Sequence, residues 1–188
     1  MFELYLKLGF DHILDIAAID HLAFLLVLLS SVNPKHTKKL VILITAFTIG
    51  HSFSLAASTL EWLKIDSDII EFLIPVTILI SALINLLPSK IVPKNNKLLF
   101  GSVIFFGLIH GMGFSNYLAE SMRNMDGSIL IPLLGFNIGV ELAQLILVSP
   151  LVLIGRLIFI RNENLSDKMW IYPGSIIGLL LSIYLILG

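Results

Sequence analysis

Four histidines lie within or beside apolar stretches long enough to cross a lipid bilayer: His12, His21, His51 and His110. An ionisable side chain at the bilayer centre costs roughly 2.5–3.5 kcal/mol on insertion scales, so such groups persist mainly where they face a bundle interior and have partners. Imidazole is a good ligand for nickel, cobalt, zinc and copper. The histidines therefore predict a metal site at membrane depth.

Carboxylate and amide side chains accompany these histidines. On one predicted helix, Asn137, Glu141 and Gln144 stand at i, i+4 and i+7, which places them on one narrow stripe. A carboxylate completes the shell of a divalent ion and offsets its charge. Asp11, His12 and Asp15 are expected to form a vestibule near the outer edge. The candidate metal-site residues are His21, Asp20, His51, His110, Glu141, His12, Asp15 and Asn137.

The composition places the chain in the membrane class. Of its 188 residues, 57% are hydrophobic and 13% are charged, and the mean hydropathy is +0.97. A soluble domain of this length would need more polar residues to cover its surface. The net charge of −1 provides no basic field for nucleic acid, so the expected partners are the lipid bilayer and a metal ion. The chain has no cysteine, which excludes disulfides and thiolate ligands.

Apolar runs of about 20 residues predict an all-α integral membrane protein forming one domain over residues 1–188. The N-terminus lacks a basic segment before its apolar part, so we expect no cleaved signal peptide. Pro, Gly and Asn clusters separate the runs. About six transmembrane helices are predicted, at 12–31, 40–60, 69–87, 98–120, 130–155 and 170–187.

The basic residues predict the orientation of these helices. Nine of the twelve lysines and arginines lie in or beside the first, third and fifth connections. Basic residues favour the cytoplasmic side of a membrane. Both termini of this multi-pass protein are therefore predicted to lie on the opposite side of the membrane.

An internal repeat is suggested by spacing. His21 and His110 are 89 positions apart, and so are Phe47 in FTIG and Phe136 in FNIG. This offset equals three predicted helices, and three is odd, so the two halves would have opposite orientations. Inverted repeats of this kind bracket the midplane site of many transporters. The sequence thus favours two inverted three-helix halves, at about 10–87 and 98–187.

Five segments resemble the HupE/UreJ family of bacterial membrane proteins: GFDHILDIAAIDHLAFLL, TAFTIGHSFSLA, IEFLIPVTILISALIN, FGLIHGMGF and LLGFNIGVELAQ. The resemblance implies a permease of the bacterial inner membrane that is associated with nickel or cobalt supply. In that membrane both termini are predicted to be periplasmic. The family pattern covers His12, Asp15, Asp20, His21, His51, His110, Asn137 and Glu141. The chain has no His-rich loop or tail for metal capture, which leaves the identity of the metal open.

Three functions fit these residues. The first is passage of Ni²⁺ or Co²⁺ as the transported substrate through the His/Asp/Glu site. The second is an intramembrane hydrolase, with Zn²⁺ held by the same cluster and Glu141 as general base. The third is a membrane subunit of a larger assembly, whose polar core is structural. The sequence also leaves open a homo-oligomer or another membrane partner.

Overall fold

The computed structural model describes residues 1–15, 18–88, 95–122, 129–161 and 166–188. Within these residues the protein consists of helices joined by short connections, with no β-strand, as the sequence predicts. The helices are α1 (Phe2–Leu14), α2 (Ile19–Ser30), α3 (Thr37–Thr59), α4 (Ser67–Leu86), α5 (Asn96–Gly113), α6 (Ser115–Met122), α7 (Leu130–Arg161) and α8 (Lys168–Leu187).

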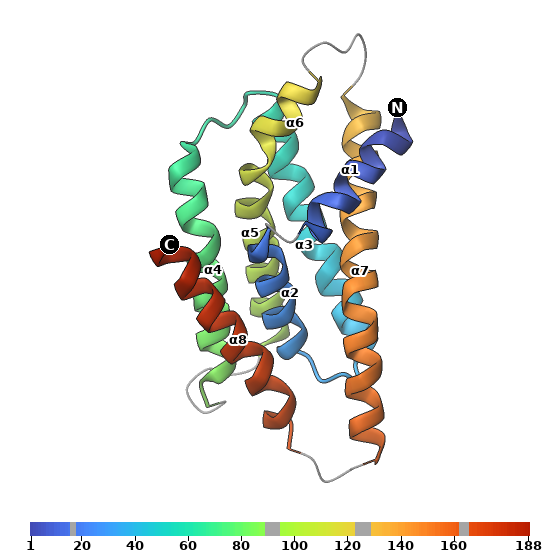
Figure 1. Cartoon of the computed structure of the whole chain (residues 1–188), viewed down its shortest axis with the longest axis vertical. Coiled ribbons are helices and arrows are strands. Elements are labelled where there is room, and N and C mark those ends of the chain that lie inside the picture. The colour runs from blue at the N-terminus through green and yellow to red at the C-terminus, as the bar shows by residue number, and fades with distance from the viewer. Residues whose placement is uncertain (16–17, 89–94, 123–128, 162–165) are drawn as a thin grey trace.

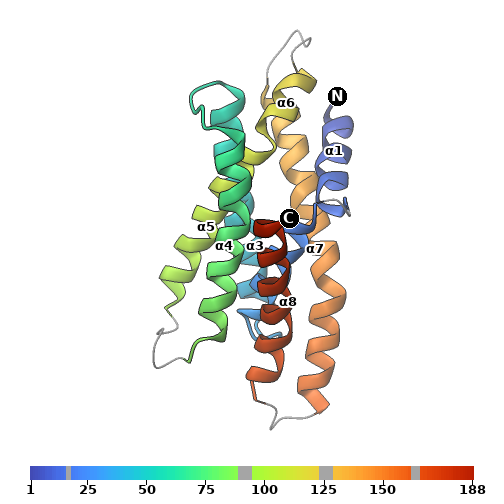
Figure 2. The same ribbon diagram turned by 60° about the vertical axis from the view of Figure 1, so that its left-hand side comes forward.

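The helices form a bundle that crosses a membrane five or six times. Five of them, α3, α4, α5, α7 and α8, are long and apolar enough to span, and α1 with α2, which are bent by 75°, make a sixth if the pair counts as one span. Figures 1 and 2 show α1 and α2 both descending, and the other five long helices then alternating in direction. The predicted number of passes is therefore confirmed if α1 and α2 count as one.

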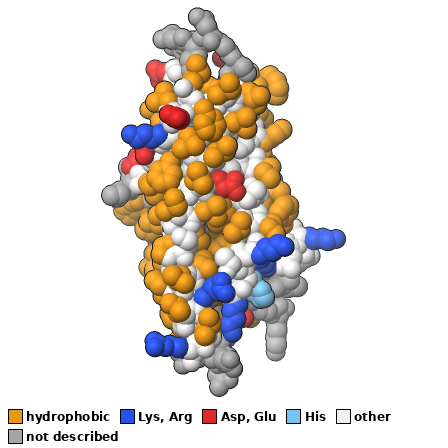
Figure 3. All heavy atoms as spheres, turned by 90° about the vertical axis from the view of Figure 1, so that its right-hand side faces the viewer, with side chains coloured by type: hydrophobic (Ala, Val, Ile, Leu, Met, Phe, Trp, Pro, Cys, Tyr) orange, Lys and Arg blue, Asp and Glu red, His pale blue; other side chains and the backbone are white. Residues whose placement is uncertain are grey.

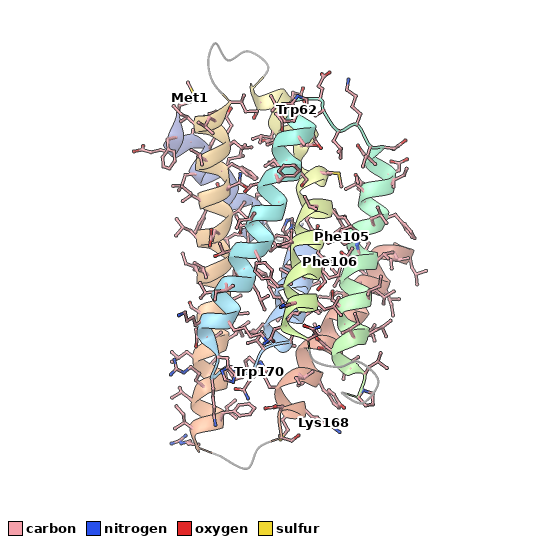
Figure 4. All side chains as sticks on the ribbon, turned by 180° about the vertical axis from the view of Figure 1, so that it is seen from behind. Met1, Trp62, Phe105, Phe106, Lys168 and Trp170 are labelled. Atoms are coloured by element: carbon pink, nitrogen blue, oxygen red, sulfur yellow. The ribbon has the colours of Figure 1, made fainter. Side chains whose placement is uncertain are left out.

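The surface agrees with a lipid environment. Hydrophobic side chains cover most of the face shown in Figure 3, while most of its Lys and Arg side chains gather towards the lower end. Trp62 lies near one end of the bundle and Trp170 near the other (Figure 4), and tryptophans favour the two membrane interfaces. The protein is thus a membrane protein. Its inner-membrane location and periplasmic termini stay predictions.

The predicted continuous helix over 12–31 is wrong. Asp15 follows α1 with an extended backbone (φ −63°, ψ 120°), and α2 begins at Ile19. The position of one acid favours a second helix that begins here. Asp20 lies in the first turn of α2, where the helix dipole stabilises its carboxylate.

Two other predicted boundaries need correction. The helix predicted over 98–120 is divided after Gly113 into α5 and the eight-residue α6. The helix predicted to end at 155 continues through Arg156 to Arg161. With 32 residues, α7 is about 48 Å long, so it extends beyond a hydrocarbon core of about 30 Å and carries its arginines out of it.

Two close helix contacts hold the centre of the bundle. In the α3–α5 seam, a Cβ added at Gly50, Gly107 or Gly111 would collide with backbone atoms of the facing helix. In the α1–α7 seam, the same holds for Gly9, Gly135 and Gly139. Small residues permit this approach of backbones, as they do in many membrane bundles. Pairing of α1 with α7 and of α3 with α5 fits an inverted repeat, which stays a prediction.

Candidate metal site

Four histidines from four helices meet in the interior of the bundle. His12 comes from the last turn of α1, His21 from the first turn of α2, His51 from α3 and His110 from α5. The ring centroid of His12 lies 4.6 Å from that of His21 and 6.5 Å from that of His51, and the His21 and His110 centroids are 5.8 Å apart. We call this group, with Asp20, the histidine cluster.

The break between α1 and α2 creates half of this cluster. His12 and His21 are nine residues apart, so a continuous helix would separate them by about 13.5 Å along its axis. The bend instead brings their rings into edge-to-face contact. The separation that the helix predicted over 12–31 gives these two histidines is therefore wrong. Broken helices at a midplane ion site are a feature of transporters.

Ligand atoms in the cluster are close enough to share an ion. Two triads, His12/His21/His51 and Asp20/His21/His110, each offer three atoms within 4.8 Å of one another. Two nitrogens bound 2.1 Å from one ion can be at most about 4.2 Å apart. Small side-chain rotations would therefore close either triad around a divalent cation. His21 belongs to both triads, so the two positions are adjacent and overlapping.

Asp20 orients the shared histidine. Its Oδ1 lies 3.1 Å from His21 Nδ1. A carboxylate in that position accepts a hydrogen from Nδ1, which leaves Nε2 as the metal-binding nitrogen and raises its basicity. His21 Nε2 is buried and has no hydrogen-bond partner. Asp20 can thus orient His21 in the first triad through a hydrogen bond to Nδ1, or bind an ion directly in the second triad.

Buried imidazole nitrogens without a partner make this cluster a candidate ligand site. Both ring nitrogens of His110 and Nε2 of His12 and His21 are buried without a hydrogen-bond partner, and His51 has only the side chain of Asn137 beside it. Leaving such a group buried and unpaired costs about 1–3 kcal/mol. A neutral imidazole has one nitrogen with a free lone pair, so a bound cation would account for one nitrogen on each of the four rings.

Asn137 and Glu141 occupy different surroundings. Asn137 is buried beside His51; its Nδ2 donates to Leu133 O at 2.8 Å, and its Oδ1 has no partner. Glu141 instead accepts a hydrogen bond from Thr45 Oγ1 at 2.5 Å. Among the described residues, neither triad includes Glu141. The structure therefore brings Asn137 to the edge of the cluster and holds Glu141 in a separate contact between α3 and α7.

An open pocket leads to the cluster from the end of the bundle where the chain starts. It is lined by Leu8, Asp11, His12, Leu14, Asp15, Phe114 and Tyr117. Asp11 and Asp15 are exposed, while His12 is partly buried and reaches the other histidines. The three residues expected to form a vestibule therefore share one pocket, and His12 connects it to the interior.

Phenylalanines close the cluster on other sides, a feature that the sequence prediction missed. Phe24 and Phe47 stack at 4.4 Å, and their ring centroids lie 5.4 and 5.3 Å from that of His110. Phe114 stacks on Phe136 at 4.9 Å beside His12. A low-dielectric wall strengthens electrostatic interactions inside it. The only sequence signal was FTIG and FNIG, whose phenylalanines both face the cluster.

Comparison with known proteins gives one match. A family model described as HupE / UreJ protein matches residues 1–187. No curated protein and no solved structure matches the chain.

Proposed function

Since this chain belongs to the HupE/UreJ family, we propose that it carries a divalent transition metal ion, nickel or cobalt, across the bacterial inner membrane through the histidine cluster. The observation that supports this most is the gathering of three buried histidines and the partly buried His12, with buried ring nitrogens, around Asp20. Imidazole with carboxylate suits borderline divalent ions, and the chain has no thiolate that would favour softer ones.

The geometry supports a stepwise path. Asp11 and Asp15 at the open pocket attract a cation and concentrate it near His12. The first triad, which contains His12, takes the ion from the pocket. Because His21 also belongs to the second triad, the ion moves inwards by exchanging His12 and His51 for Asp20 and His110 while it keeps one ligand. Release on the far side then requires Phe24 and Phe47 to separate, since they pack against His110.

The hydrolase alternative is less well supported. It assigned Glu141 as general base, and the structure binds this carboxylate to Thr45 rather than beside the cluster. A general base must lie within hydrogen-bond reach of the attacking water. A hydrolase would also retain stoichiometric zinc on purification, whereas a permease binds its ion weakly enough to release it.

The test is metal binding by the purified protein in detergent, measured by calorimetry with nickel and cobalt and by mass spectrometry of the metals retained. The His51→Ala/His110→Ala variant should lose micromolar binding, since it removes a ligand from each triad. His36→Ala is the matched control, because His36 is exposed in the connection before α3. Equal binding by all three proteins would refute the proposal, and stoichiometric zinc lost only in the double variant would favour the hydrolase.

Transport itself is measured in liposomes that contain a metal-sensitive dye. Wild-type protein should admit nickel or cobalt, and the double variant should not. Histidine must be neutral to bind a metal, so protons compete with the ion for the imidazole nitrogens, and uptake should fall only at a pH low enough to protonate the cluster itself. Equal uptake by the wild type and the double variant would contradict direct ligation by imidazole. Loss of folding in the alanine variants without any metal binding by the wild type would instead favour a structural polar core.

A further inference from the structure

A second cavity lies between α2, α4 and α5, at the end of the bundle opposite to the open pocket. The cavity has a wide part and a narrower extension, and the wide part has a volume of about 280 Å³. The walls are mainly apolar side chains from α4, α5 and α8, and they include Ile84, Leu87, Leu98, Leu99, Phe106 and Ile171. Figure 4 shows Phe106 at mid-height on α5, so the cavity extends from the end of the bundle well into its membrane-spanning part.

The mouth of this cavity is polar and positively charged. Lys39, Asn95 and Asn96 line it, and Lys39 Nζ donates a hydrogen bond to Asn96 Oδ1 at 2.7 Å. Ammonium and amide groups at the edge of a membrane are suited to a phosphate head group. The cavity therefore combines an anion-binding mouth with an apolar interior.

A narrower extension of about 50 Å³ continues inwards from the wide part. The two share six lining residues, among them Leu99, Ser102 and Phe106, and the extension reaches Val27 and Phe24. Along α5, Asn96 and Phe106 are separated by ten residues, or about 15 Å. This equals half of a hydrocarbon core of about 30 Å, which is the depth of one lipid leaflet.

The walls do not suit a cation. The three hydroxyl groups that line the extension, those of Ser31, Ser81 and Ser102, already donate to the carbonyls of Leu28, Thr77 and Leu99 in their own helices. Asn85 donates its amide to Val27 O and Ser175 Oγ. No carboxylate or imidazole lines either part of the cavity within the described residues. An acyl chain, in contrast, needs only the apolar surface that the cavity provides.

We propose that this cavity binds one anionic phospholipid, with its phosphate at Lys39 and Asn96 and one acyl chain between α4 and α5. The methyl end of the acyl chain lies at Phe24, whose ring centroid is 5.4 Å from that of His110. The bound lipid thus touches the phenylalanine that closes the histidine cluster. Lipid binding does not depend on the proposed metal transport and can be measured without any metal.

The experiment is native mass spectrometry of the purified protein after incubation with phosphatidylglycerol or phosphatidylcholine. Wild-type protein should retain one phosphatidylglycerol and at least about fivefold less phosphatidylcholine. Lys39→Glu should lose this preference, because it reverses the charge at the mouth. Lys38→Glu is the matched control, since Lys38 is exposed in the same part of the chain but does not line the cavity.

A second pair of variants tests the interior. Ser102→Trp fills the apolar part and should abolish retention of either lipid. Ser149→Trp places the same side chain on the exposed surface of α7, where the serine also bonds to a carbonyl three residues before it, and should bind as the wild type does. Equal retention by the wild type, Lys39→Glu and Ser102→Trp would overturn the proposal. Equal retention of the two lipids by the wild type would overturn its anionic specificity.

Discussion

The two glycine seams flank the histidine cluster but differ in how firmly they are held. The α3–α5 seam joins two continuous helices, and α3 alone buries eleven residues. The α1–α7 seam joins a long helix to the short α1, which buries only Tyr5, Gly9 and Ile13. The first seam supplies His51 and His110, and the second positions His12. One side of the site is therefore part of the core, whereas the other rests on a short helix whose one extensive contact within the described residues is with α7.

This difference matters for a site that must both bind an ion and release it. Elements with few buried contacts open at low free energy, while core helices open only with the whole fold. The pocket that leads outwards is lined by α1 and the start of α6. We therefore expect α1 to move during loading, while α3 and α5 keep the inner ligands in place.

The largest effect is expected from a substitution within the α3–α5 seam. In Gly111→Leu, the new side chain would overlap the His51 carbonyl and the Ser54 hydroxyl. Overpacking of a core costs about 1–3 kcal/mol or more, and about 3 kcal/mol lowers the melting temperature of a protein of this size by about 10 °C. The melting temperature is measured by heating samples and quantifying the remaining folded protein by size-exclusion chromatography. Gly101→Leu, where nothing lies within 4 Å of an added Cβ, should unfold near the wild-type temperature. Equal melting of the two variants would contradict the close seam.

A substitution in the α1–α7 seam should weaken metal binding more than it weakens the fold. In Gly9→Val, the added side chain would overlap the Phe136 carbonyl and push α1 away from α7. His12 then leaves the first triad, so nickel affinity should fall by about 10-fold or more. His12→Ala, which removes the ligand without moving α1, should give a similar loss. Gly9→Val that binds nickel normally but melts as early as Gly111→Leu would show that the two seams are equivalent.

Several features of the site could be predicted from residue types and hydropathy. The apolar runs located the passes, and the polar groups within them identified the residues of the cluster. The break between α1 and α2 could not be predicted, because the sequence from Asp15 to Asp20 contains neither Gly nor Pro. The only sign was Asp20 in the middle of one presumed helix, and the preference of an aspartate for the first turn of a helix is weak in energy.

The position of Glu141 shows a second limit. The i, i+4, i+7 stripe correctly predicts that Asn137, Glu141 and Gln144 share a face of α7. Residues four positions apart differ in height by about 6 Å, however, so only Asn137 lies beside His51, while Thr48 Oγ1 donates to Gln144 Oε1 at 3.2 Å. A helical stripe shows which face of the helix the side chains share. Which residue each side chain contacts along the helix axis depends on tertiary packing.

The two intramembrane acids should therefore differ in their effect on metal binding. Asp20→Asn removes the charge that orients His21, and loss of such a partner typically lowers metal affinity by 10- to 100-fold. Glu141→Gln keeps an acceptor for Thr45 outside the cluster, so its nickel affinity should be within about twofold of the wild type. Calorimetry on both variants checks this. A large loss in Glu141→Gln would place this carboxylate in the metal path, as the sequence alone suggested.

The smallest effect is expected where the two seams are connected. Thr45 of α3 and Glu141 of α7 form a hydrogen bond between one helix of each seam. Side-chain hydrogen bonds within membranes contribute about 0.6 kcal/mol on average and rarely more than about 1.7. Thr45→Val should thus lower the free energy of unfolding by about 1 kcal/mol and leave nickel affinity unchanged. A double-mutant cycle with Glu141→Leu, which removes the acceptor, isolates the contact. A coupling near zero would mean that the seams are held together by apolar packing and by the Thr48–Gln144 hydrogen bond instead, and that the carboxylate of Glu141 has another role in the membrane.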